Sequence, residues 1–195
     1  GETLVVETLY GEKRLPRQTV LAERCRSCKT KKMACYDELL GEDGTDCGDG
    51  RMEGVRRLEA MTPDERFRFW QGELSRCIRC NACRNVCPAC SCEKCVFDNP
   101  ASGVENKAAA NSFEENLFHI IRAFHVAGRC TDCGECSRVC PQHIPLHLLN
   151  RKLIADMNEL YGPYQAGADL ESRPPLMDFR FDDPEPSTAR RGGAQ

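Results

Sequence analysis

The chain has 195 residues, of which fifteen are cysteines, and its formal net charge is −3. The odd cysteine count and an opening without a signal-peptide pattern argue against a secreted disulfide scaffold. The charge balance lacks the basic excess that binding to nucleic-acid phosphates requires, and no apolar run approaches the roughly 20 residues of a membrane helix. We therefore expect a cytoplasmic protein with no membrane span and no nucleic-acid partner, whose thiols are free or metal-bound.

The first segment reads as a small β-hairpin. Residues 3–8 and 13–15 have the composition of strands, and Gly11 marks the turn. An isolated hairpin of two strands is marginally stable, and the chain opens with Gly1 rather than Met. We therefore expect residues 1–61, the hairpin and a cysteine-containing linker, to be the end of an upstream domain.

Three helices are predicted over residues 62–162, so the fold class is mainly α. Capping boxes at Thr62–Glu65 and Ser112–Glu115 open the first two helices, and the third runs from Pro145 to Gly162. The first should bury Phe67, Trp70 and Leu74, and the second Phe113, Leu117, Ile120, Ile121 and Phe124; the third should bury Leu148, Leu149, Leu153, Ile154, Met157 and Leu160. Residues 163–195, rich in Pro, Gly and charge, should form an extended or disordered tail.

The strongest pattern is a doubled cysteine motif. Cys77-x-x-Cys80-x-x-Cys83-x-x-x-Cys87-Pro88 returns, with identical spacing, as Cys130-x-x-Cys133-x-x-Cys136-x-x-x-Cys140-Pro141. In such a motif three thiolates hold one [4Fe-4S] cubane, and the fourth ligates the other cluster. The spacing thus predicts cluster one on Cys77, Cys80, Cys83 and Cys140, and cluster two on Cys87, Cys130, Cys133 and Cys136. A cluster bound only by the folded chain also stabilises a thin core.

Other interpretations of these cysteines fit less well. Zinc also accepts four thiolates, but it usually pairs Cys-x-x-Cys units rather than triplets closed by Cys-Pro. Cys83-x-x-x-Cys87-x-x-Cys90 spells a radical S-adenosylmethionine triplet, which would break up a doubled pattern that otherwise closes completely. We found no phosphate-binding loop, no Ser/His/Asp set and no paired carboxylates, so no catalytic residue is predicted.

Seven cysteines remain for a third metal centre, an iron-sulfur cluster in preference to zinc. The provisional ligands are Cys25, Cys28, Cys35 and Cys47, and the unassigned candidates are Cys90, Cys92 and Cys95. The histidines near the motifs are interpreted more simply. We expect His119 and His125 to be packed or surface residues, and His143 to be solvated in its loop.

Two stretches around the motifs carry a family resemblance. Residues 75–95, SRCIRCNACRNVCPACSCEKC, and residues 122–136, RAFHVAGRCTDCGEC, resemble the dicluster region of the β subunits of deazaflavin-coenzyme hydrogenases and formate dehydrogenases, and related subunits of anaerobes. Ile144-Pro145-Leu146 and Leu149–Leu153 extend the match, which covers roughly residues 12–180. The resemblance implies an α-helical ferredoxin-like dicluster module over residues 62–162, with helices between the cluster loops.

The same resemblance implies partners and a further cofactor. An upstream flavin-binding domain is expected, on a missing domain or a partner, and Cys25-x-x-Cys28 would complete a cluster with it. Cys35 stands where relatives often have Pro, and Cys47 lies in a loop of its own, so a locally closed third site remains an alternative. The expected partners are the flavoprotein and the hydrogenase, formate dehydrogenase or heterodisulfide-reductase-like subunits of a redox complex.

Three functional hypotheses follow. The first is single-electron transfer between the flavin-bearing domain and a catalytic subunit. The second is a structural or adaptor module, whose metal sites only fold the chain and whose tail docks complex subunits. The third is catalysis at a non-cubane cluster on Cys90, Cys92 and Cys95, for which ordinary ligation or packing is the simpler alternative.

Overall fold

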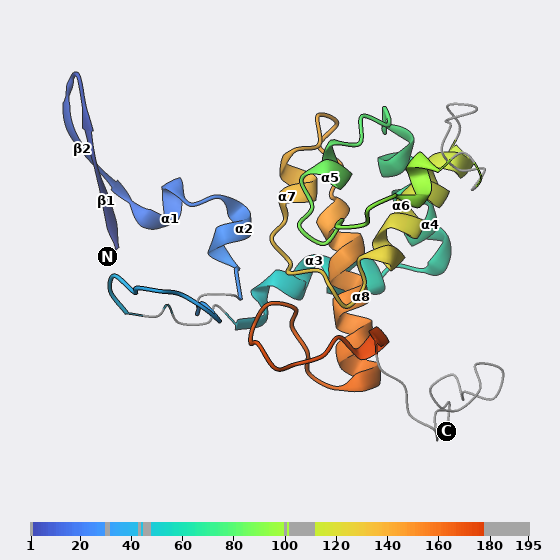
Figure 1. Ribbon diagram of the computed structural model, residues 1–195. Helices are drawn as coiled ribbons and strands as arrows, with labels where there is room; N and C mark the ends of the chain where they lie inside the picture. The colour runs from blue at the N-terminus through green and yellow to red at the C-terminus, as the bar shows by residue number, and fades with distance from the viewer. Residues whose placement is uncertain are drawn as a thin grey trace.

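The computed structural model describes residues 2–29, 32–42, 44, 48–99, 101 and 112–177, and it is mainly helical (Figure 1). The helices from α3 (Glu53–Glu59) to α8 (Leu146–Tyr161) gather into one body. The predicted mainly α fold with a small N-terminal hairpin is confirmed. Cys47, and residues 178–195 of the predicted tail, lie outside the described residues.

The hairpin projects away from the helical body (Figure 1). Strands β1 (Thr3–Thr8) and β2 (Gly11–Pro16) pair antiparallel, with Thr8 opposite Gly11 at the turn. Gly11 has a φ of +108°, a backbone conformation that favours glycine. The turn residues Leu9 and Tyr10 are almost fully exposed. The hairpin is followed by two short helices, α1 (Arg17–Val20) and α2 (Glu23–Arg26).

Helix α4 (Pro63–Ser75) begins where its sequence predicts. The Thr62 hydroxyl accepts a hydrogen bond from the Glu65 amide at 3.3 Å, and the Glu65 carboxylate accepts one from the Thr62 amide at 2.9 Å. These reciprocal bonds satisfy two donors that a helix start leaves open. Leu74 is fully buried and Trp70 packs against the core, but Phe67 is exposed, so the predicted buried face covers only the second half of the helix.

Helix α6 (Ser112–His125) buries a different face from the predicted one. Phe113, Ile120 and Phe124 are exposed, and Leu117 is on the margin of exposure. The buried face instead carries polar residues beside Phe118 and Ala123, namely Glu115, His119 and Arg122. The prediction was wrong because it assumed an apolar core, whereas α6 turns its polar stripe toward the cysteine loops.

Helix α8 also buries polar side chains and exposes an apolar residue that was predicted to be buried. It begins after Pro145 and ends at Gly162, as predicted, and Gly162 has a φ of +94°. Ile154 and Met157 are buried as expected, but Leu160 is exposed, while Asn150 and Arg151 are buried. These two polar side chains face the second cysteine loop, where they find hydrogen-bond partners.

Sulfur takes a large share of the core. One buried cluster joins Leu74, Ile144 and Leu146 with cysteine side chains, and Trp70 and Leu149 pack against it; the cysteines are Cys83, Cys136 and Cys140, with Cys77 at the edge. Two short helices in the cysteine loops, α5 (Ala82–Asn85) and α7 (Glu135–Arg138), contact each other, and α7 contacts α8. In the described part of the chain, no helix is both long enough and apolar enough to cross a bilayer.

A buried ion-pair network fixes the second cysteine loop to the helical body. The Asp132 carboxylate accepts from Arg51 Nη1 at 2.9 Å and from Arg151 Nε at 2.7 Å, and all three side chains are almost fully buried. Arg51 lies in the 3₁₀ turn η1 (Gly48–Met52), which precedes α3, and it also donates to Gln165 at 2.9 Å. The network thus joins the loop to α8 and to the segments before α3 and after α8.

Replacing Asp132 with Ala should destabilise the protein, because it leaves two buried guanidinium groups without their shared carboxylate. Removing one partner of a buried ion pair typically costs about 3–5 kcal/mol. We expect a loss of that order in the free energy of unfolding of the metal-loaded chain, measured by anaerobic urea denaturation. Glu12→Ala is the control, since it breaks an exposed pair with Arg14 at 2.7 Å and should cost under about 1 kcal/mol. Equal denaturation midpoints would contradict this role for Asp132.

Candidate iron-sulfur site

The two cysteine loops have the same backbone conformation. Arg79 and Asp132, each two residues after the first cysteine, have φ of 54° and 59°. Asn81 and Gly134, each one residue after the second cysteine, have φ of 60° and 70°, and each immediately precedes a helix of four residues. The left-handed region is rarely occupied by residues other than glycine, so its use at equivalent positions marks a structural repeat and not only a sequence repeat.

Hydrogen bonds to sulfur also recur at equivalent positions. The Arg79 amide lies 3.4 Å from Cys77 Sγ, and the Asp132 amide lies 3.4 Å from Cys130 Sγ. The buried side-chain amide of Asn150 donates to Cys136 Sγ at 3.7 Å. Donors aimed at sulfur stabilise the thiolate form, and they are one way in which a protein sets the potential of a bound cluster.

The structure brings together the four thiols predicted for cluster two. Cys87 lines one cavity with Cys130, Cys133 and Cys136, next to Pro88 and Asn150. Cys87 comes from the first loop and the other three come from the second. This is the crossed arrangement that the doubled motif predicts.

Three of the thiols predicted for cluster one meet in the sulfur-rich core. Cys83 and Cys140 are buried there, and Cys77 packs against them. Burial is the largest effect on the pKa of Cys83 and raises it, the charge of Arg122 lowers it, and Cys140 and Cys80 raise it further. Cys80 is exposed.

Burial disfavours the charged thiolate form of these cysteines, so a bound metal is needed to stabilise that form. Burial is the main cause that raises the pKa of Cys77 and of Cys136 to about 11, and that of Cys130 to about 12. Without a metal the thiols would therefore stay protonated near neutral pH. Iron supplies the positive charge that thiolates need, so binding of a cluster and burial of the loops stabilise each other.

Arg122 on α6 is a buried cation beside both cysteine loops. Its Nη2 donates to the Cys83 carbonyl oxygen at 2.8 Å. Its charge favours the thiolate form of Cys83 and of Cys136, which belong to different predicted clusters, although burial is the larger effect and raises the pKa of both. Sequence reasoning missed this residue.

Sequence reasoning gave Glu115 no role, and it expected His119 to be a packed or surface residue; the structure packs His119 in the interior. Both are buried, and their ligand atoms lie within 4.8 Å of each other and of Cys77 Sγ. Burial, with the charges of Arg122 and Arg79, lowers the pKa of His119 to about 3, so its imidazole is neutral. This mixed donor set is one that zinc also accepts. The spacing of Glu115, His119 and Arg122, four and three residues apart, is the signal that could have found the stripe.

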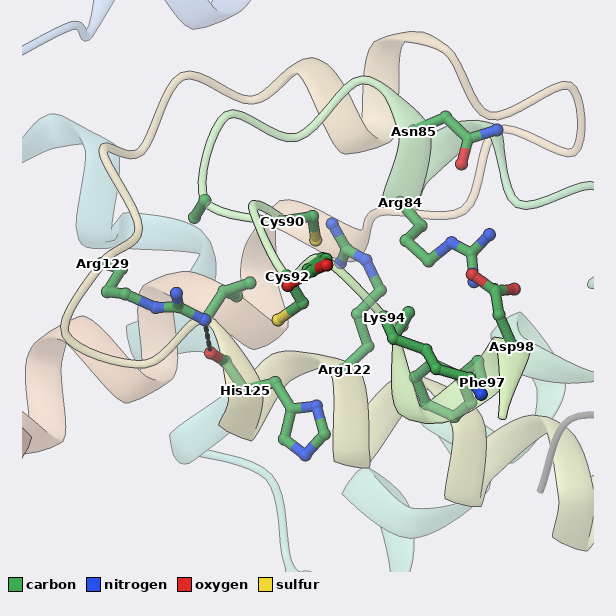
Figure 2. A pocket seen from close by; sticks show the side chains of 14 residues that line it. Arg84, Asn85, Cys90, Cys92, Lys94, Phe97, Asp98, Arg122, His125 and Arg129 are labelled. Atoms are coloured by element: carbon green, nitrogen blue, oxygen red, sulfur yellow. Dashed lines mark hydrogen bonds and ion pairs between the residues drawn. The ribbon is translucent and has the colours of Figure 1, made fainter. Parts of the chain in front are cut away.

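Of the four provisional third-centre cysteines, the structure describes Cys25, Cys28 and Cys35, all of which precede α3 in the chain. Cys25 and Cys28 are half-buried in and just after α2, and Cys35 is exposed. Arg24 of the same helix pairs with Glu135 of α7 at 2.9 Å. The segment that carries Cys25 is thus docked beside the second cysteine loop. Cys90, Cys92 and Cys95 lie elsewhere, on the wall of a separate cavity; Figure 2 labels Cys90 and Cys92 there.

Comparison with known proteins agrees with this geometry. Residues 73–144, which span all eight predicted cubane ligands, match the family model described as "4Fe-4S dicluster domain". Residues 73–144 are thus similar to a dicluster iron-sulfur domain, as the sequence resemblance predicts, and this similarity supports 4Fe-4S binding.

Curated relatives extend the match to subunits of larger enzymes. The β subunit of the F420-dependent formate dehydrogenase of Methanocaldococcus jannaschii is 32% identical over 110 residues, 56% of this chain and 28% of the relative. The β subunit of F420-dependent formate dehydrogenase 1 of Methanococcus maripaludis is 33% identical over 55% of this chain and 26% of the relative. The succinate dehydrogenase iron-sulfur subunit of Bacillus subtilis is 33% identical over 48% of this chain and 39% of the relative. The chain thus spans only about a quarter to two fifths of these relatives.

Replacing Arg122 with Gln should lower the midpoint potential of the bound clusters. A cluster gains negative charge on reduction, and a buried cation stabilises the reduced form. We expect a negative shift in an anaerobic redox titration followed by EPR. Arg138→Gln is the matched control, because Arg138 pairs with Glu135 at 2.6 Å on the exposed side of α7. Unchanged potentials in Arg122→Gln would contradict the assignment.

Proposed function

We propose that this chain is an electron-transfer subunit or domain that carries two [4Fe-4S] clusters with crossed ligands. Cluster one would be held by Cys77, Cys80, Cys83 and Cys140, and cluster two by Cys87, Cys130, Cys133 and Cys136. The observation that carries the proposal is the cavity where Cys87 of the first loop meets three cysteines of the second. Bound there, the clusters accept and donate one electron at a time.

The surrounding residues have the properties that a relay needs. Cys83, Cys136 and Cys140 are buried, and amide donors from Arg79, Asp132 and Asn150 stabilise negative charge on sulfur. Arg122 adds a fixed positive charge beside both loops. These groups hold and tune a cofactor, and among the described residues we identify no group placed to transform a substrate.

We infer that the electrons pass between a flavin-bearing domain or subunit and a catalytic oxidoreductase subunit. The relatives are named as subunits of dehydrogenases, two of them F420-dependent formate dehydrogenases. The exposed apolar face of α6, formed by Phe113, Leu117, Ile120 and Phe124, supports assembly with another subunit of such a complex, since soluble monomers rarely expose large apolar patches.

Cys83→Ser tests electron transfer against a purely structural or adaptor role. If the clusters relay electrons, loss of a cluster-one ligand should abolish electron transfer through the assembled complex, because the path is broken. We would measure turnover with the physiological donor, and check assembly by size-exclusion chromatography. Full turnover in an assembled Cys83→Ser complex would favour the adaptor role.

The crossed ligand assignment has its own test. Cys87→Ser and Cys133→Ser should alter the same cluster signal, although the two residues lie in different loops, because both ligate cluster two. Cys80→Ser should alter the other signal. EPR of the three reduced variants distinguishes the cases, and paired changes in Cys87→Ser and Cys80→Ser would show that each loop closes its own cluster.

A further inference from the structure

A second cysteine-lined cavity lies beside the two predicted cubane sites. Its volume is about 440 Å³, and its wall includes Cys90, Cys92 and Cys95 (Figure 2). No other cysteine is among the described residues that line this cavity. None of these three belongs to either of the two crossed ligand sets. The three thiols that the doubled motif leaves over after Cys87 therefore share one site.

The wall of this cavity is positively charged. Arg84, Lys94, Arg122 and Arg129 all line it. Asp98, one of the two acids on the wall, is neutralised by Arg84 at 2.7 Å. The Nε atom of Arg122 is buried and has no hydrogen-bond partner among the described residues, and Figure 2 shows this side chain reaching the neighbourhood of Cys90. The cavity therefore suits an anionic occupant.

The segment that carries the three thiols is held at both ends. At its start, the Cys90 amide donates to the Cys87 carbonyl oxygen at 3.0 Å. At its end, the 3₁₀ turn η2 (Val96–Asp98) buries Phe97, whose ring lies 4.6 Å from that of Phe118 on α6. The thiols are thus presented by a fixed loop, which lowers the entropy cost of binding a metal.

We propose that Cys90, Cys92 and Cys95 hold a third metal centre, an iron-sulfur cluster with three cysteine ligands and one position for another ligand. Three thiolates around a [4Fe-4S] core carry net negative charge, which the basic wall would neutralise. The cavity is also larger than a single zinc ion needs. Cys90 follows cluster-two ligand Cys87 by three residues and contacts it, so the centre would extend the relay. The proposal rests on the electron-transfer function proposed above.

The alternative ligand set for a third centre is Cys25, Cys28, Cys35 and Cys47. One exposed cysteine from each set can therefore be replaced and the two variants compared. Cys92 and Cys35 are both exposed, so neither substitution by Ser disturbs the sulfur-rich core. After anaerobic reconstitution, Cys92→Ser and Cys95→Ser should each lose about four irons per chain. Cys35→Ser should keep the wild-type iron content.

Oxidation of the third cluster gives a second readout, which three cysteines with a purely structural role would not produce. A [4Fe-4S]²⁺ cluster held by three cysteines can lose one electron to ferricyanide and release Fe²⁺, which leaves a [3Fe-4S]⁺ cluster with an EPR signal. We expect this signal in the wild-type chain and in Cys35→Ser, and its loss in Cys92→Ser.

The outcomes separate this proposal from the one on which it rests. Wild-type chain with about eight irons, unchanged in Cys92→Ser, would overturn the third centre and leave the two crossed cubanes standing. Iron loss in Cys35→Ser alone, or zinc that Cys92→Ser removes, would also overturn it. Wild-type chain without iron would overturn both proposals.

Discussion

The convergence of thiols from two loops that lie far apart in the sequence is the constraint on which the rest of this structure depends. Cys87 and Cys130 lie 43 residues apart in the sequence, yet they share one cavity wall. Protonated thiols alone pack like small apolar side chains, but thiolates on a metal tie the loops together. Metal binding would therefore complete the fold as well as supply the chemistry.

This constraint explains why two helices bury polar faces. A core that receives charged clusters needs donors and cations around the sulfur atoms, so α6 presents Arg122 and α8 presents Asn150 inward. The same orientation of α6 leaves Phe113 and Phe124 exposed. Arg122 donates to the loop backbone, Asn150 to a predicted ligand and Arg151 to the loop acid, and these bonds offset part of the cost of burying them. In the second cysteine loop itself, the buried acid Asp132 is likewise paired, with Arg51 and Arg151.

Local sequence signals predicted the hairpin and helices α4, α6 and α8, but not α3. The crossed ligand sets of the doubled motif stay a prediction. The capping box at Thr62 set the start of α4, and Gly162 the end of α8. The buried faces of α6 and α8 could not be predicted from hydrophobic periodicity, because that rule assumes an apolar core, whereas this core contains Cys83, Cys136 and Cys140. Leu160 and Phe124, which periodicity assigns to buried faces, are exposed. The polar stripe of Glu115, His119 and Arg122 was visible in the sequence, but only the fold shows what it faces.

Metal analysis of the anaerobically reconstituted chain, combined with EPR of its reduced form, tests the central claim most directly. Two crossed cubanes predict at least about eight irons per chain and interacting signals from neighbouring reduced clusters. Stoichiometric zinc without iron, and no signal on reduction, would contradict the account.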